Sequence, residues 1–133
     1  MKQFLLLLLV VLPLCITACS KSSAESGNQF EYYVKYASDG LDGRGIYAYN
    51  VSYTDENGKK NSFSNMSSDS FERIIGPVSA GFKADFRIWV ANTNDTKTRS
   101  ARIEVKNGND PFTVKVEKTG KGSGGVSVTY TIE

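Results

Sequence analysis

Residues 82–90 read FKADFRIWV, and this stretch decides the fold class. Apolar side chains fall on every second residue from Phe82 to Val90, and most of the side chains between them are charged. A period of two is that of a β-strand with one face in the core and the other in solvent, whereas an amphipathic helix repeats its apolar residues every three to four positions. The stretch therefore predicts a half-buried strand.

The same alternation recurs along the rest of the chain. Apolar residues share one face in residues 30–36, 47–53, 101–105, 112–116 and 126–132. In one of these runs, Phe112, Val114 and Val116 are expected to face the core together. Two weaker runs, around Phe63 and over residues 71–75, are expected to supply the remaining strands. Seven or eight such strands predict an all-β fold, a single antiparallel β-sandwich.

Residues suited to turns separate these runs. DENG (55–58) and NGND (107–110) each contain Asn-Gly, which tolerates the positive φ of tight hairpins. We expect residues 76–81, which begin with Gly76-Pro77, to break one strand before the next begins. Residues 120–125, GKGSGG, are expected to form a loose connection.

The first 28 residues have a different character. Lys2 precedes an apolar run that is too short for a stable transmembrane span and that Pro13 interrupts. The run ends in ITAC (16–19), which resembles the lipobox of bacterial lipoproteins. That resemblance implies a signal peptide over residues 1–18, cleavage before Cys19, and attachment of lipid to the Cys19 thiolate. The alternative is an ordinary secretory signal with a free thiol.

A flexible tether and one domain follow Cys19. Residues 20–28 are small and polar throughout, so residues 19–28 are expected to tether a sandwich domain over residues 29–133. With Cys19 lipidated and Cys15 removed with the signal, no disulfide is expected. The chain carries 16 basic and 14 acidic side chains. Loss of Lys2 leaves a near-neutral chain, which offers no electrostatic case for nucleic acid or for an anionic membrane surface as partner.

A family resemblance rests on strand order and turn placement. VSYTDENGK, GPVSAGFKADFRIWVAN and ARIEVKNG follow one another, and a glycine-rich turn precedes GVSVTYTI. This order is similar to that of small Bacteroidales-type lipoproteins of uncharacterised function. More distantly, it resembles the soluble domain of the mycobacterial small membrane proteins that assist lipid transporters. Because the cysteine pair and membrane helix common in that group are missing, its transport role is not carried over. The resemblance implies an immunoglobulin-like or transthyretin-like sandwich.

The composition argues against an enzyme. The chain contains no histidine, which removes Ser-His-Asp and Cys-His catalysis and imidazole metal ligands. A carboxylate pair could still serve glycoside chemistry. The acidic strand residues, however, alternate with apolar ones, as on a solvated sheet face: Glu31, Glu72, Asp85, Glu104 and Glu117.

Two loops are rich in oxygen ligands. Residues 39–43, DGLDG, and residues 92–95, NTND, could bind calcium through their side-chain oxygens. Both lack the spaced acids and the closing glutamate of an EF-hand loop. Since Asp and Asn are also the default residues of loops, we predict no metal and no other cofactor.

Two aromatic residues fall out of phase with the apolar face. Trp89 and Tyr33 belong to the faces assigned to solvent, and Arg87 lies two residues before Trp89 on the same side. An exposed aromatic side chain among polar neighbours can stack on sugar rings or anchor a protein partner. The alternatives are that a loop or the tether covers these residues, or that both faces of a central strand are buried.

Two functions follow as hypotheses. The first is a monomeric, non-catalytic lipoprotein that binds a protein partner at the cell envelope, held to the membrane by its N-terminal lipid. The second is a glycan-binding accessory lipoprotein with Tyr33 and Trp89 as its platform. Because no aspartate follows Cys19, the outer membrane is favoured, with the domain facing the periplasm or the cell surface.

Overall fold

Eight β-strands make up the folded part of the chain. The computed structural model describes residues 30–41, 49–90 and 97–133. The strands are β1 (Tyr32–Asp39), β2 (Tyr49–Thr54), β3 (Lys60–Met66), β4 (Phe71–Val78), β5 (Lys83–Val90), β6 (Thr98–Asn107), β7 (Thr113–Lys121) and β8 (Gly124–Thr131). Within these residues, no helix has the length and apolar character needed to cross a membrane.

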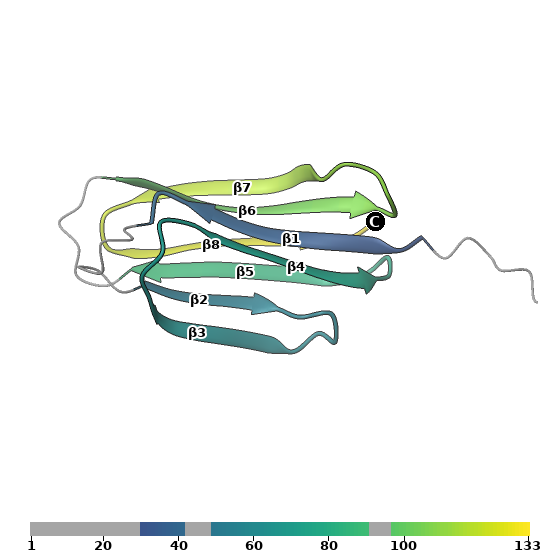
Figure 1. The fold of residues 1–133 in the computed structure, drawn as a ribbon, viewed down its shortest axis with the longest axis horizontal. Coiled ribbons are helices and arrows are strands. Elements are labelled where there is room, and N and C mark those ends of the chain that lie inside the picture. The colour runs from purple at the N-terminus through teal and green to yellow at the C-terminus, as the bar shows by residue number, and fades with distance from the viewer. Residues whose placement is uncertain (1–29, 42–48, 91–96) are drawn as a thin grey trace, which may run out of the picture.

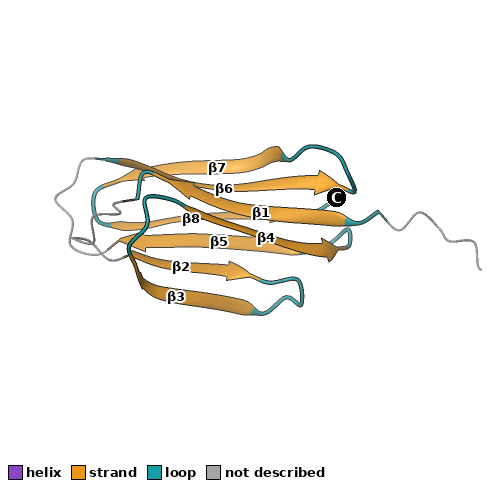
Figure 2. Ribbon diagram, in the orientation of Figure 1, coloured by secondary structure: helices purple, strands orange, loops and turns teal. Residues whose placement is uncertain are grey.

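The strands form two four-stranded sheets that pack face to face (Figures 1 and 2). The first sheet has the order β4-β1-β6-β7 and the second has the order β3-β2-β5-β8. All neighbouring strands run antiparallel. The predicted antiparallel β-sandwich is therefore confirmed, with both weaker runs present as β3 and β4.

The core lies between the sheets and is rich in tyrosine. Along β5, buried apolar residues alternate strictly with exposed ones, as FKADFRIWV predicts. The Tyr36 ring lies 5.4 Å from Tyr53 and 5.5 Å from Phe86, centroid to centroid. Its hydroxyl donates to the carbonyl of Thr54 at 2.7 Å, so a fully buried polar group keeps a partner. Burial raises the pKa of this hydroxyl above its usual range.

Both predicted hairpins are present. Gly58 has φ 77° between β2 and β3, and its N–H donates to the carbonyl of Asp55 at 2.9 Å. Gly108 has φ 50° between β6 and β7, where the Asp110 N–H donates to the carbonyl of Asn107 at 2.9 Å. The Asn-Gly pairs therefore supply the left-handed residue that each turn needs.

Two predicted connections are present but shorter than predicted. Gly76 and Pro77 lie inside β4, and residues 79–82 separate β4 from β5. β4 is an edge strand, and its register with β1 shifts between the Val78 and Ile75 pairs, which are the settings in which a strand tolerates proline. The connection predicted for residues 120–125 is also shorter, since only Gly122 and Ser123 separate β7 from β8.

The predicted orientation of the 112–116 run is wrong over its first half. Val114 is 55% exposed and pairs with Glu104 on the outer face of the first sheet, whereas Val116 pairs with Ile103 and packs against the core. The register shifts between these two pairs, so β7 carries one extra residue there. Such a β-bulge reverses the phase of every side chain beyond it.

Candidate functional site

The outer face of the second sheet, turned away from the core, carries the exposed tryptophan. The alternation of β5 directs Lys83, Asp85, Arg87 and Trp89 outward. Trp89 is 41% exposed although β5 is a central strand. The predicted placement of Trp89 on the solvent face is confirmed, and burial of both faces of the central strand is wrong.

Trp89 lies against a glycine of the neighbouring strand. It pairs with Gly125 of β8, and a Cβ at Gly125 would come within 2.9 Å of the Trp89 ring atom Cε3. The same Cβ would approach Nε and a terminal nitrogen of Arg87 to 3.2 Å. The Arg87 guanidinium carbon lies 5.1 Å from the centroid of the Trp89 ring. Gly125 thus provides the room in which the two side chains lie together.

Two adjoining hollows open beside this pair. The smaller has a volume of about 350 Å³, and its polar lining comes from Asn50, Ser52, Lys60, Ser62, Ser64 and Arg87, with Trp89 at one side. The larger, of about 500 Å³, shares Ser52, Lys60 and Arg87 with it and adds Asp85, Ser127 and Thr129. The Thr129 hydroxyl donates to the Asp85 carboxylate. We call this surface the β2–β5 trough. It offers hydroxyl, amide and cationic groups beside the Trp89 ring, and Phe63, which is 46% exposed, also lines the smaller hollow.

Sequence reasoning found Trp89 and Arg87 but missed Ser52, Lys60 and Gly125. The missed residues lie on β2, β3 and β8, and only the strand order brings them beside β5. Period-two alternation marked Ser52 as outward-facing, so the signal for orientation was present. The sequence did not show that Ser52 lies beside Arg87, because the pairing of β2 with β5 joins residues far apart in the chain.

Tyr33 belongs to a different surface. It lies on β1, on the outer face of the first sheet, with the Lys106 ammonium 5.0 Å from its ring centroid. Lys106 also lies 5.3 Å from the ring of Phe112. Trp89 is on the outer face of the other sheet, so a single platform formed by Tyr33 and Trp89 is wrong. The fold brings only Arg87 and Trp89 together.

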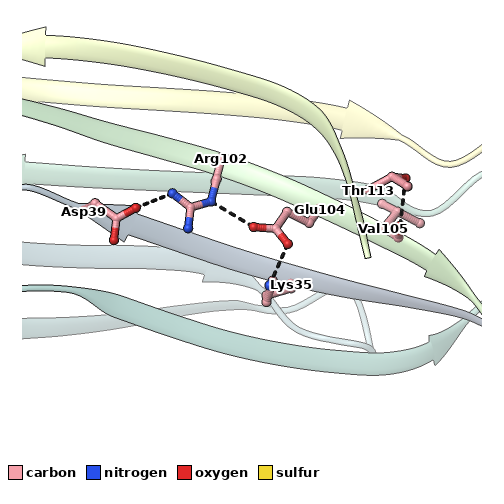
Figure 3. Close-up of polar contacts among 6 residues, drawn as sticks. All are labelled: Lys35, Asp39, Arg102, Glu104, Val105 and Thr113. Carbon is pink, nitrogen blue, oxygen red and sulfur yellow. Dashed lines mark hydrogen bonds and ion pairs between the residues drawn. The ribbon is translucent and has the colours of Figure 1, made fainter. Parts of the chain in front are cut away.

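One of the five strand carboxylates is not solvated as predicted. Glu104 is 7% exposed on the outer face of the first sheet, because long neighbouring side chains cover it. It accepts hydrogen bonds from Lys35 at 2.6 Å and Arg102 at 2.8 Å, and Arg102 also binds Asp39 (Figure 3). Burial alone would raise the pKa of Glu104, but these two cations hold that pKa below its usual range.

The two loops that were considered for calcium, where no metal is predicted, fall largely outside the described ranges. Asp42, Gly43 and residues 92–95 lie there, as do the signal segment, Cys19 and the tether. Asp39 is described and is engaged by Arg102. Within residues 30–41, 49–90 and 97–133, no group of three or more Cys, Asp or Glu side chains could hold a metal ion.

Comparison with known proteins adds no family to this description. No protein-family model matches the chain, and no curated protein sequence matches it. The β2–β5 trough therefore has to be interpreted from its own geometry.

Proposed function

We propose that this protein is a lipid-anchored, non-catalytic binding protein of the cell envelope that holds saccharide chains in the β2–β5 trough. The observation that carries the proposal is Trp89, which is 41% exposed on the outer face of the second sheet and lines the smaller of two open hollows. An exposed indole ring presents a flat apolar surface of the kind that the C–H face of a pyranose covers.

The groups around Trp89 suit a sugar better than an apolar ligand. Ser52 and Ser62 pair across β2 and β3, and Ser127 pairs with Arg87 across β5 and β8. These hydroxyls can donate to and accept from sugar hydroxyls. Binding pockets for apolar ligands are concave and lined by hydrophobic side chains, whereas this trough is open and polar.

Trp89 also supplies the test, because it is the single tryptophan of the chain. Polysaccharides of different composition should be titrated into the full-length chain, solubilised in a polyoxyethylene detergent that carries no sugar. A saturable change in tryptophan emission, with binding abolished by Trp89→Ala in a label-free assay, supports the proposal. The matched control is Tyr33→Ala, on the opposite face, which should bind as the parent does. Loss of saccharide binding in both variants, or in neither variant, contradicts the proposal.

The anchor has a separate test. The proposal is supported by ITAC at residues 16–19 behind a positively charged apolar leader. Changing Cys19 to Ala should release the protein from the membrane fraction or leave an uncleaved precursor, because a methyl group cannot form the thioether. Cys15→Ala is the matched control and should change neither property. If Cys19→Ala fractionates and migrates as the parent does, Cys19 is not the anchor.

A second candidate function is the binding of a protein partner on the opposite face. It is favoured by Ile74 and Val114, which are 49% and 55% exposed on the outer face of the first sheet, the face that carries Tyr33 and Phe112. Exposed apolar side chains with aromatic neighbours are typical of interfaces. A complex purified from membranes should be lost with Ile74→Asp and kept with Trp89→Ala. The reverse pattern would place the partner on the β2–β5 trough.

A further inference from the structure

We propose that the saccharide of the β2–β5 trough is acidic, a polysaccharide that carries carboxylates as uronic acids do. This inference rests on the saccharide-binding function proposed above and specifies its ligand. The smaller hollow beside Trp89 is lined by two cations, Lys60 and Arg87, and by no carboxylate.

Both cations are available to a ligand. Within the part of the chain that the structure describes, neither Lys60 nor Arg87 forms an ion pair, whereas Lys35 and Arg102 on the other sheet do. Asp85 is the acid closest in sequence to Arg87, and it accepts a hydrogen bond from Thr129 in the larger hollow. Charge complementarity at the smaller hollow therefore favours an anion.

The two cations flank a groove that follows β2. Arg87 pairs with Ser52 on one side of β2, and Lys60 pairs with Thr54 on the other side. Their backbones are two inter-strand spacings apart across the sheet, about 10 Å, and are offset by two residues along β2, about 7 Å. A linear chain that lies along β2 would pass between the cations and place its hydroxyls near Ser52. A polymer that carries repeated charges could offer a separate anionic group to each of the two cations, both of which line the smaller hollow.

The arrangement of Arg87 beside Trp89 suits a uronic acid. The guanidinium carbon is 5.1 Å from the ring centroid of Trp89, farther than face-to-face contact distance, so the guanidinium leaves part of the ring uncovered. A pyranose on the uncovered part would direct a C6 carboxylate, close to its mean ring plane, toward the guanidinium. Arginine donates two parallel N–H bonds to a planar carboxylate.

The experiment compares polymers that share a backbone and differ in charge. Polygalacturonate and its fully methyl-esterified form are titrated into the full-length, detergent-solubilised chain, followed by tryptophan emission and by calorimetry. We expect polygalacturonate to bind at least about tenfold more tightly at low salt, and the difference to shrink as sodium chloride screens the charges. Dextran sulfate and dextran form the second pair, and dextran sulfate should bind more weakly than polygalacturonate.

Substitutions test which residues bind the charged groups of the polymer. Lys60→Gln should weaken polygalacturonate binding by roughly threefold, as expected for an exposed charge pair, and should weaken binding of the ester by less. The matched control is Lys83→Gln, which removes the same charge from the same face but outside both hollows. Trp89→Ala should abolish the binding of both polymers.

The outcomes separate this inference from the function on which it rests. Equal affinity for the acid and its ester, each dependent on Trp89, overturns the acidic ligand and keeps the saccharide-binding function. Tighter binding of dextran sulfate than of polygalacturonate overturns the assignment to carboxylate. Equal losses for Lys60→Gln and Lys83→Gln show a diffuse charge effect and overturn the site. Binding of neither polymer, or binding that survives Trp89→Ala, overturns both proposals.

Discussion

Trp89 belongs to the surface of the protein and not to its core. The effect of Trp89→Ala on the free energy of unfolding should show this. Its ring is 41% exposed and rests on Gly125 and Arg87, so Trp89→Ala opens no internal cavity. We expect the free energy of unfolding to fall by about 1 kcal/mol or less, the sum of a surface substitution and one cation–π contact. The matched variant Phe86→Ala, at a buried position of the same strand, should cost roughly 3–5 kcal/mol. Urea denaturation of both variants measures the difference, and similar losses would contradict the exposed placement.

Glu104 should make stability depend on pH. Lys35 and Arg102 hold its pKa below the usual value, so its ionised form is favoured more in the folded chain than in the unfolded chain. The stabilisation is therefore complete above about pH 4.5, the range of an unperturbed glutamate, and is lost as pH falls through the folded-state pKa. Glu104→Gln should lower the free energy of unfolding by about 1–3 kcal/mol at pH 7.

The pH profile distinguishes Glu104 from other acidic groups. The gap between the parent and Glu104→Gln should narrow progressively between about pH 5 and pH 2, as measured by denaturation at each pH. Glu72→Gln, at an exposed position of β4, is the control and should follow the parent throughout. A gap that stays constant with pH would mean that Glu104 acts through packing alone.

At the scale of an element, the bulge in β7 decides which valine belongs to the core. Val114 is 55% exposed, whereas Val116 packs against the core. Val114→Ala should change the free energy of unfolding by no more than about 0.5 kcal/mol. Val116→Ala should cost roughly 1–2 kcal/mol, because buried methyl groups are lost. The same denaturation assay compares the two, and equal losses would mean that β7 runs without the phase reversal.

The elements also show what local sequence could predict. The position and orientation of β5 could be predicted from the sequence, because β5 is a regular central strand whose apolar and polar residues alternate without interruption. The orientation of β7 could not be predicted. Its bulge arises from pairing with β6, and the apolar spacing of Phe112, Val114 and Val116 is regular despite it. Only part of the β2–β5 trough could be predicted, because its residues come from several strands. Trp89 and Arg87 share one strand, but Lys60 reaches the site through the pairing of β3 with β2.

At the scale of the whole molecule, the first sheet carries residues on both of its edge strands that oppose pairing with other chains. The edge strands of the first sheet are β4 and β7, and those of the second are β3 and β8. β4 contains Pro77, which has no N–H to offer another chain, and β7 carries Lys115, Lys118 and Lys121. Proline and lysine on edge strands oppose edge-to-edge pairing. Both edges of the first sheet therefore oppose pairing with another chain.

The same features predict that a chain beginning at Ser26 folds without the N-terminal segment. Every buried apolar side chain of the described residues lies between Val34 and Ile132, and both cysteines, Cys15 and Cys19, precede the first strand. The domain should show a β-type circular dichroism spectrum, unfold in one cooperative step, and elute as a monomer. Its denaturation midpoint should be the same with and without a thiol reductant, because it contains no thiol. A helix-dominated spectrum, concentration-dependent association, or unfolding that only the N-terminal segment prevents would show that the sandwich does not stand on its own core.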